Sequence, residues 1–226
     1  MSFGEMFCIQ RDSGWLVAVA LPELGADFGL ESLGELTSEE VAYAQTLEAR
    51  RAGQFVGGRL ALRSALGKLN APKTPSLPNP RGAPIVPAGY RGSITHKDDV
   101  AVAYACLDTG WHVGVDVEVP LPERTRIASR VLTTDELEAI DGLEPTDRWL
   151  ATLTRFSLKE AIYKAIDPLV KRYVGFKEVA LTPEQSGAVS VHMRLKTPEN
   201  LEIYCELDQQ QGLIISLAKA RFSHPV

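Results

Sequence analysis

Two carboxylates in the middle of the chain have the spacing of a metal-binding pair. Asp116 and Glu118 stand two residues apart in the alternating segment HVGVDVEV, so on a strand both project from one face while valines occupy the other. Adjacent carboxylates repel each other, and one takes up a proton unless a cation neutralises the pair. Since Mg²⁺ and Mn²⁺ prefer carboxylate oxygens, the segment is a candidate metal platform. The alternative, a solvated strand face, is what the pattern alone favours.

A third carboxylate lies on a predicted helix. In the segment FSLKEAIYKA, Glu160 and Lys164 are four residues apart, which places both side chains on one helix face. Glu160 would add a third carboxylate to the candidate metal platform. The alternative is a surface Glu–Lys pair worth about 0.3 kcal/mol.

Basic side chains nearer the N-terminus are candidates for binding phosphate. Arg50, Arg51, Arg59 and Arg63 recur along one predicted helix, and arginine forks match phosphate oxygens. The alternative is a solvated basic face. His96, at the end of the segment GSITH, is a candidate phosphate ligand or base, although a lone histidine is more often structural. The chain has neither a P-loop nor a G-x-G-x-x-G motif, so side chains would have to hold a nucleotide.

Hydrophobic pattern and turn residues predict the elements of the first half. Residues 15–21 (WLVAVAL) form an apolar run of strand length. Residues 37–40 have the spacing of a capping box, and the apolar pattern predicts a helix from there to about Leu69. Residues 70–92 contain six prolines and three glycines, which predicts a loop. Two strands are expected next, at residues 93–95 and 100–106.

The second half repeats the order of the first. Residues 132–137 (LTTDEL) are similar to residues 36–41 (LTSEEV), again with the spacing of a capping box between Thr133 and Glu136. A helix is expected in each half, over residues 149–166 and 54–69. Weak alternation predicts antiparallel strands over residues 189–195, 201–207 and 213–217, with turns at Gly187 and Gly212. We therefore predict an α+β protein of two similar, pseudo-twofold halves, each an antiparallel sheet packed with helices.

Composition narrows the functional classes. The 226 residues are 45% hydrophobic and 23% charged, with a formal net charge of −5, which excludes disorder and argues against a general nucleic-acid binder. The three cysteines, Cys8, Cys106 and Cys205, are too widely spaced to suggest a disulfide framework or a zinc site. No apolar run reaches the roughly 20 residues of a membrane span, and residues 1–10 lack the basic start of a signal peptide. We therefore expect a cytoplasmic protein that binds neither membrane nor nucleic acid.

Four blocks together resemble the 4′-phosphopantetheinyl transferases of the surfactin and enterobactin type. The blocks are RAGQFVGGR (51–59), RGAP (81–84) running into GSITH (92–96), GVDVE (114–118) and FSLKEAIYKA (156–165). Phe156 replaces the tryptophan of the surfactin subgroup, which points to the enterobactin-type subgroup. Lys97 and Val86 depart from the commonest enterobactin-type pattern, so the subgroup and the preferred carrier stay open.

The resemblance implies a reaction. Such an enzyme moves the 4′-phosphopantetheine arm of its substrate coenzyme A onto a serine of an apo acyl or peptidyl carrier protein and releases adenosine 3′,5′-bisphosphate. The implied cofactor is Mg²⁺, with Mn²⁺ as the alternative. The carrier would serve polyketide, nonribosomal peptide, siderophore or fatty-acid synthesis.

The resemblance also implies roles for individual residues. Asp116, Glu118 and Glu160 would hold Mg²⁺, and Glu160 would instead, or also, deprotonate the serine directly or through a water. Coenzyme A would be contacted by Lys159 and Lys164 at the phosphate chain, Thr95 and His96 at the phosphates, Arg51 and Arg59 at the 3′-phosphate, and Arg81 near the nucleotide. Glu160, Lys164 and His96 form the implied catalytic set.

The expected organisation is a monomer with two halves. Residues 1–113 would bind the nucleotide and residues 114–226 would carry the metal and the catalytic helix, with the active site in a cleft between them. A candidate docking patch for the acidic carrier combines Arg124, Arg126 and Arg130 with the apolar Ile127, Val131 and Leu132. Two rival functions are a metal-dependent phosphodiesterase or nuclease, and a non-catalytic protein that binds coenzyme A.

Overall fold

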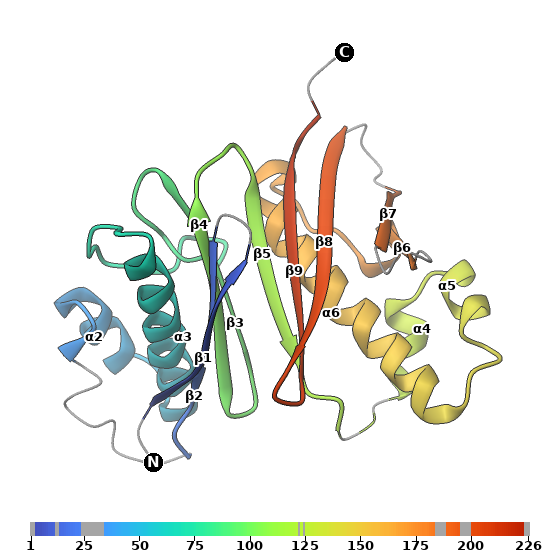
Figure 1. Cartoon of the computed structure of the whole chain (residues 1–226), viewed down its shortest axis with the longest axis horizontal. Helices are drawn as coiled ribbons and strands as arrows, with labels where there is room; N and C mark the ends of the chain where they lie inside the picture. The colour runs from blue at the N-terminus through green and yellow to red at the C-terminus, as the bar shows by residue number, and fades with distance from the viewer. Residues whose placement is uncertain are drawn as a thin grey trace. The chain divides into compact units, whose positions relative to one another are not determined.

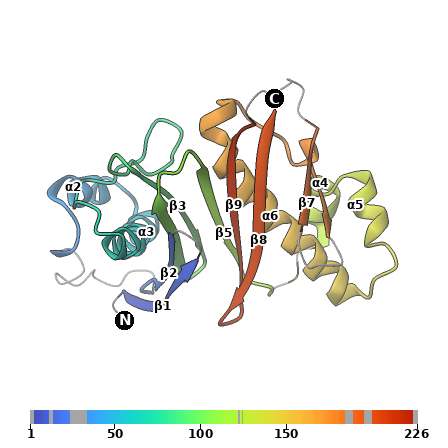
Figure 2. The ribbon, with the colours of Figure 1, turned by 45° about the horizontal axis from the view of Figure 1, so that its top comes forward.

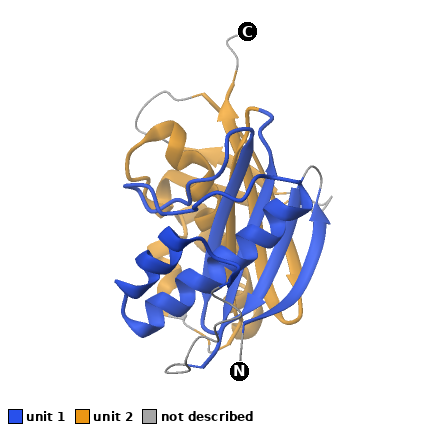
Figure 3. Cartoon of the chain, turned by 90° about the vertical axis from the view of Figure 1, so that its left-hand side faces the viewer, with its two compact units in different colours: residues 1–109 blue, residues 110–226 orange. Residues whose placement is uncertain are grey.

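The computed structural model describes residues 3–11, 14–23, 34–121, 123, 125–183, 189–194 and 200–223. The chain divides into two compact units, residues 1–109 and 110–226, which Figure 3 colours separately. Three predicted features lie outside the described residues: the turn at Gly187, the strand end at Leu195 and the basic side chain of Arg124.

The first unit contains a four-stranded antiparallel sheet. Its strands, which Figure 1 labels, pair in the order β1 (Gly4–Arg11), β2 (Gly14–Ala20), β4 (Val100–Leu107) and β3 (Tyr90–Lys97). The long helix α3 (Ala49–Lys68) packs on this sheet through a core of small and branched side chains that includes Leu62, Ala65 and Val17. The three strands expected in this half are confirmed, and strand β1 was missed.

The helix expected from residue 37 to about residue 69 is wrong in one respect, because it is two helices. Helix α2 (Ser38–Gln45) begins at Thr37 with the expected capping box, and α3 begins after Glu48. Thr46 ends α2: its hydroxyl donates to the carbonyl oxygen of Tyr43 at 2.7 Å, which competes with continued helix.

The second unit contains a three-stranded antiparallel sheet in the order β5 (His112–Glu118), β9 (Leu213–Phe222) and β8 (Leu201–Gln210). Helix α6 (Pro145–Val170) lies across one face of this sheet (Figure 2). A small sheet pairs β6 (Val179–Pro183) with β7 (Val189–Met193). The remaining elements are η1 (Thr125–Ile127), α4 (Ala128–Val131), α5 (Thr134–Ala139) and η2 (Phe176–Glu178).

The predicted α+β class is confirmed, since each unit is an antiparallel sheet packed with helices. The second capping box is also present, with Thr133 as the N-cap of α5. Gly212 has a φ of 79° at the turn between β8 and β9, as expected. Strand β6 was missed. No helix in the described parts of the chain is long and apolar enough to cross a membrane.

Candidate active site

Glycine at position 114 lets helix α6 lie very close to strand β5. A Cβ on Gly114 would collide with the carbonyl oxygen of Ala161 and would lie 2.8 Å from the amide nitrogen of Ala165. Ala161 and Ala165 are fully buried and one helical turn apart, so they present small side chains to the strand. The glycine and alanines of the two sequence blocks therefore have a packing role.

This close packing brings Lys164 to the carboxylate pair. Its Nζ donates to Oδ1 of Asp116 at 3.0 Å and to the carbonyl oxygen of Val115 at 2.8 Å. Asp116 and Glu118 are each only 6% exposed, so the solvated-face alternative is wrong. The surface-pair alternative is also wrong for Lys164, because its ion pair crosses from α6 to β5.

Glu160 lies in the electrostatic field of the same carboxylates. Burial raises its pKa most, Asp116 and then Glu118 raise it further, and Lys164 opposes them. Such a concentration of hard oxygen donors and negative charge fits a divalent cation. Within the described residues, however, no three histidine, cysteine or acidic side chains are already arranged to hold a metal ion. The metal roles of Asp116, Glu118 and Glu160 therefore stay a prediction.

Lys159, although adjacent to Glu160 in sequence, extends into the protein interior. It is 0% exposed, and its Nζ donates to Glu136 and to the carbonyl oxygens of Val131 and Phe176. An ammonium has three N–H donors, so Lys159 has no donor left for a ligand in this arrangement. Burial lowers the pKa of Lys159, and the hydrogen bond to Glu136 opposes that shift.

In the first unit, the structure brings Arg51 and His96 together. Nη1 of Arg51, at the start of α3, lies 2.9 Å from Nε2 of His96 on β3, and 3.3 Å from Oε1 of Gln54. Thr95 is 7% exposed, and as the neighbour of His96 on a strand it projects to the opposite face. Thr95 and His96 therefore do not share one face.

Arg59 is buried rather than part of a solvated basic face. It is 8% exposed, its Nε donates to the carbonyl oxygen of Ser76 at 2.6 Å, and its guanidinium lies 4.1 Å from the centre of the Phe55 ring. Burial lowers the pKa of Arg59 to about 10, so the side chain keeps its charge at neutral pH.

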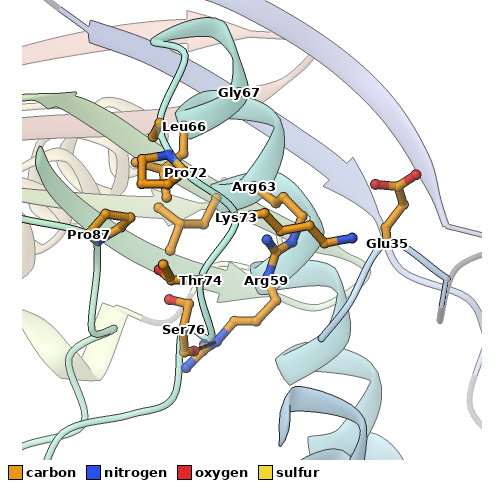
Figure 4. Close-up of a pocket in the computed structure, with 12 residues that line it drawn as sticks. Glu35, Arg59, Arg63, Leu66, Gly67, Pro72, Lys73, Thr74, Ser76 and Pro87 are labelled. Atoms are coloured by element: carbon orange, nitrogen blue, oxygen red, sulfur yellow. Dashed lines mark hydrogen bonds between the residues drawn. The ribbon is translucent and has the colours of Figure 1, made fainter. Parts of the chain in front are cut away.

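A pocket of about 260 Å³ opens beside Arg59. Figure 4 shows that Arg59 extends toward Ser76, whereas Lys73 extends toward Glu35. The lining of the pocket combines cationic side chains with apolar ones: Arg59, Arg63 and Lys73 with Leu62, Leu66 and Pro72. Lys73 was not predicted from the sequence, because the residue spacing in a proline-rich loop does not show that the loop folds back onto α3. Arg81 is not among the lining residues; its backbone N–H donates to Oδ1 of Asn79 at 2.8 Å.

The proposed carrier-docking patch is wrong in its apolar part. Val131 and Leu132 are 3% and 0% exposed and form a core cluster with Ile140. They are buried because α4 turns its apolar side inward. Arg126 and Arg130 are exposed, so a basic surface remains at this position.

Comparison with known proteins places both units in one family. Residues 112–218 match the 4′-phosphopantetheinyl transferase superfamily, and residues 38–106 match the 4′-phosphopantetheinyl transferase N-terminal domain. The 4′-phosphopantetheinyl transferase Npt of Nocardia iowensis is 34% identical over 183 residues, which cover 74% of this chain and 78% of that protein. Svp of Streptomyces mobaraensis is 34% identical over 168 residues, which cover 72% of this chain and 68% of that protein.

A solved structure is similar to part of the chain. The holo-(acyl-carrier-protein) synthase of Bacillus anthracis, in complex with CoA (3′,5′-ADP), has a TM-score of 0.42 and 17% identity; the match covers 49% of this chain and 96% of that one. The family itself rests on the sequence relatives, which match across most of their own length at more than 30% identity. This chain therefore belongs to the 4′-phosphopantetheinyl transferase superfamily, as its sequence blocks predicted, and is a 4′-phosphopantetheinyl transferase.

Proposed function

We propose that Glu160, Lys164, Asp116 and Glu118 carry out the chemical step of 4′-phosphopantetheinyl transfer from coenzyme A to a carrier protein. The observation that supports this assignment is the ion pair of Lys164 with Asp116, formed where burial, and after it the charges of Asp116 and Glu118, raise the pKa of Glu160. A cation and several carboxylates at one place suit a reaction whose substrate is a pyrophosphate.

The transfer is a substitution at phosphorus. The serine hydroxyl oxygen attacks the phosphorus that bears the pantetheine, and the pyrophosphate bond to the nucleotide breaks. Adenosine 3′,5′-bisphosphate leaves with the bonding electrons. Glu160 takes the serine proton, directly or through a water, and Lys164 holds the phosphate chain. Asp116, Glu118 and Glu160 would hold Mg²⁺, which would neutralise negative charge on the pyrophosphate.

The basic residues of the first unit would bind coenzyme A. Arg51 and His96 form one polar cluster, and Arg59 lines the pocket that also contains Lys73. We assign Arg51 and Arg59 to the 3′-phosphate, His96 to the phosphates and Lys73 to the nucleotide end, since coenzyme A carries several negative charges. The partner protein would be an apo acyl or peptidyl carrier of secondary metabolism.

The test is intact-protein mass spectrometry of several apo carrier proteins incubated with the enzyme, coenzyme A and Mg²⁺. We expect a mass gain of one phosphopantetheine, lost on addition of EDTA and lost with Glu160→Gln. Glu138 is exposed on α5, so Glu138→Gln is the matched control and should keep full activity. A fully active Glu160→Gln enzyme, or full activity in EDTA, would contradict the assigned chemistry. Calorimetry of coenzyme A binding to each variant separates loss of chemistry from loss of substrate binding.

A further inference from the structure

Lys159 joins three segments of the second unit through one buried ammonium group. Its Nζ lies 2.6 Å from Oε2 of Glu136, 2.9 Å from the carbonyl oxygen of Val131 and 3.1 Å from that of Phe176. Lys159 is on α6, whereas these acceptors belong to α5, α4 and η2. A buried ammonium is costly unless it is paired and hydrogen-bonded, so these contacts strongly favour one arrangement of the segments.

Glu136 extends the same network to two further backbone groups. It is the third helical residue of α5 and closes the capping box, because its Oε2 accepts the backbone N–H of Thr133 at 2.7 Å. Its Oε1 accepts the backbone N–H of Leu181, on β6, at 2.9 Å. One carboxylate therefore holds the start of α5, the strand β6 and, through Lys159, helix α6.

The network reaches the surroundings of Glu160 through Phe176. The ring of Phe176 lies 5.5 Å from that of Phe156 and 5.3 Å from that of Tyr163. Phe156 and Tyr163 stand four residues before and three residues after Glu160 on α6, so they share its side of the helix. Loss of the Lys159 hydrogen bond to Phe176 would therefore loosen the aromatic packing that lies before and after Glu160 along this side of α6.

We infer that the buried pair of Glu136 and Lys159 positions helix α6, and with it Glu160 and Lys164, for phosphopantetheinyl transfer. Gly114 and Ala161 fix one side of α6 against the sheet, and Lys159 fixes another side against α4, α5 and η2. Glu136 and Lys159 are positioning residues, because neither is placed at the reacting atoms. The inference rests on the proposed roles of Glu160 and Lys164, and it gives Lys159 a different role from the coenzyme A contact that the family resemblance implied.

The first unit provides a matched control pair. Oε2 of Glu40 accepts the N-cap N–H of Thr37 at 2.8 Å and the Nη2 of Arg63 at 2.6 Å, and its Oε1 accepts the backbone N–H of Ser76 at 2.8 Å. Glu40 thus repeats the hydrogen bonds of Glu136. In each residue, one carboxylate oxygen accepts the N–H of the N-cap threonine and a cationic group on the long helix. The other oxygen accepts a backbone N–H from a segment that follows the long helix. Glu40 is also fully buried, so Glu40→Gln removes an equivalent carboxylate from the other unit.

The test compares kcat per folded molecule with KM for coenzyme A in the full chain. We expect Lys159→Met and Glu136→Gln to lower kcat on the order of 10- to 100-fold, because a displacement of about 1 Å in a reacting group can cost that much. KM for coenzyme A should change less than about twofold. Glu40→Gln should lose thermal stability but keep its kcat. A kcat of Lys159→Met within about twofold of the unmodified enzyme, or an equal fall in Glu40→Gln, overturns the inference.

The double variant Glu136→Gln/Lys159→Met separates positioning from stability. Removing both partners leaves no uncompensated buried charge, so the melting temperature should recover relative to the single variants. The kcat should stay low, since the bonds to Val131 and Phe176 are still missing. Recovery of kcat together with the melting temperature overturns the inference. If Lys159→Met does not fold, this double variant carries the test.

Measuring Glu160→Gln together with Lys159→Met distinguishes failure of the positioning inference from failure of the proposed role of Glu160. If Glu160→Gln is inactive while Lys159→Met keeps its kcat, the positioning inference fails and the role of Glu160 stands. If Glu160→Gln keeps its kcat, the proposed role of Glu160 fails and the positioning inference fails with it.

Discussion

The ammonium of Lys164 lies 3.0 Å from Oδ1 of Asp116, an ion pair that joins α6 to β5 across 48 residues of chain. Asp116 is buried on a strand face that it shares with Glu118, so a nearby cation is needed to offset their repulsion. Lys164 supplies that charge from the helix that also carries Glu160. The pair therefore links the packing of the second unit to its proposed chemistry.

Removal of the Lys164 charge should lower the rate far more than it lowers stability. We expect Lys164→Met to reduce kcat on the order of 100-fold, because the proposed role of Lys164 places its positive charge beside the transferred phosphate. The free energy of unfolding should fall by only about 1–2 kcal/mol, since the Lys164 end of the pair is partly exposed and water screens its charge. Steady-state kinetics and urea unfolding check both expectations. Lys177 is exposed, so Lys177→Met should behave like the unmodified enzyme; a Lys164→Met enzyme of normal kcat would remove Lys164 from the chemistry.

A methyl group at position 114 should separate α6 from β5. Gly114→Ala would place a Cβ against the carbonyl oxygen of Ala161, and neither backbone can move without disturbing the core. We expect a loss of about 3 kcal/mol or more of unfolding free energy, together with loss of activity in the folded fraction. Thermal unfolding by circular dichroism measures the first effect.

The matched control for Gly114→Ala is Gly142→Ala. A Cβ on Gly142 would meet no atom within 4 Å, so its substitution should leave the melting temperature nearly unchanged. Equal melting temperatures for the two variants would show that the contact of Gly114 with Ala161 does not limit packing.

Loss of Arg51 and loss of Arg59 should differ in their effects on KM for coenzyme A and on the free energy of unfolding. Arg51 is exposed and touches His96, so Arg51→Ala should raise KM for coenzyme A on the order of tenfold without affecting folding. Arg59 is buried and bonded to the carbonyl oxygen of Ser76, so Arg59→Ala should raise KM and also lower the unfolding free energy by about 2 kcal/mol. Isothermal titration with coenzyme A and chemical unfolding separate the two effects. Arg50 is exposed on the same helix, and an Arg50→Ala variant with an equally raised KM would point to general charge attraction instead.

The local patterns predicted much of the framework of this site. The period-two alternation around Asp116 and the capping boxes at Thr37 and Thr133 depend on near neighbours in sequence, and the structure confirms all three. The sequence also placed Glu160 and Lys164 on one helix, which is α6.

Contacts between distant segments could not be predicted in this way. Glu136 was expected only as a capping residue, yet it also binds Lys159 and the backbone of β6, 45 residues away. Similarly, the sequence of a four-residue helix does not show whether the apolar Val131 lies at the surface or in the core. Its packing against Ile140 shows that it lies in the core. The break at Thr46 depends on a hydroxyl that bonds back to Tyr43, which helix propensity does not capture.

The two capping boxes allow a direct comparison of equivalent threonines in the two units. In each box the threonine hydroxyl accepts the N–H of the third helical residue at 3.3 Å, Glu40 in α2 and Glu136 in α5. Loss of such a cap costs about 1 kcal/mol, so Thr37→Ala should lower the melting temperature by about 2–4 °C. Thr133 is 3% exposed whereas Thr37 is half-buried, so Thr133→Ala should cost more, because it also leaves a buried N–H without its acceptor.

Serine variants serve as the control for the two caps, since Thr37→Ser and Thr133→Ser keep the accepting oxygen and should melt close to the unmodified protein. Calorimetry measures all four variants under the same conditions. If Thr133→Ala cost no more than Thr37→Ala, the burial of Thr133 would add nothing to its cap. The Glu136 network would then have to be held in place by Lys159 and Leu181 without help from the start of α5.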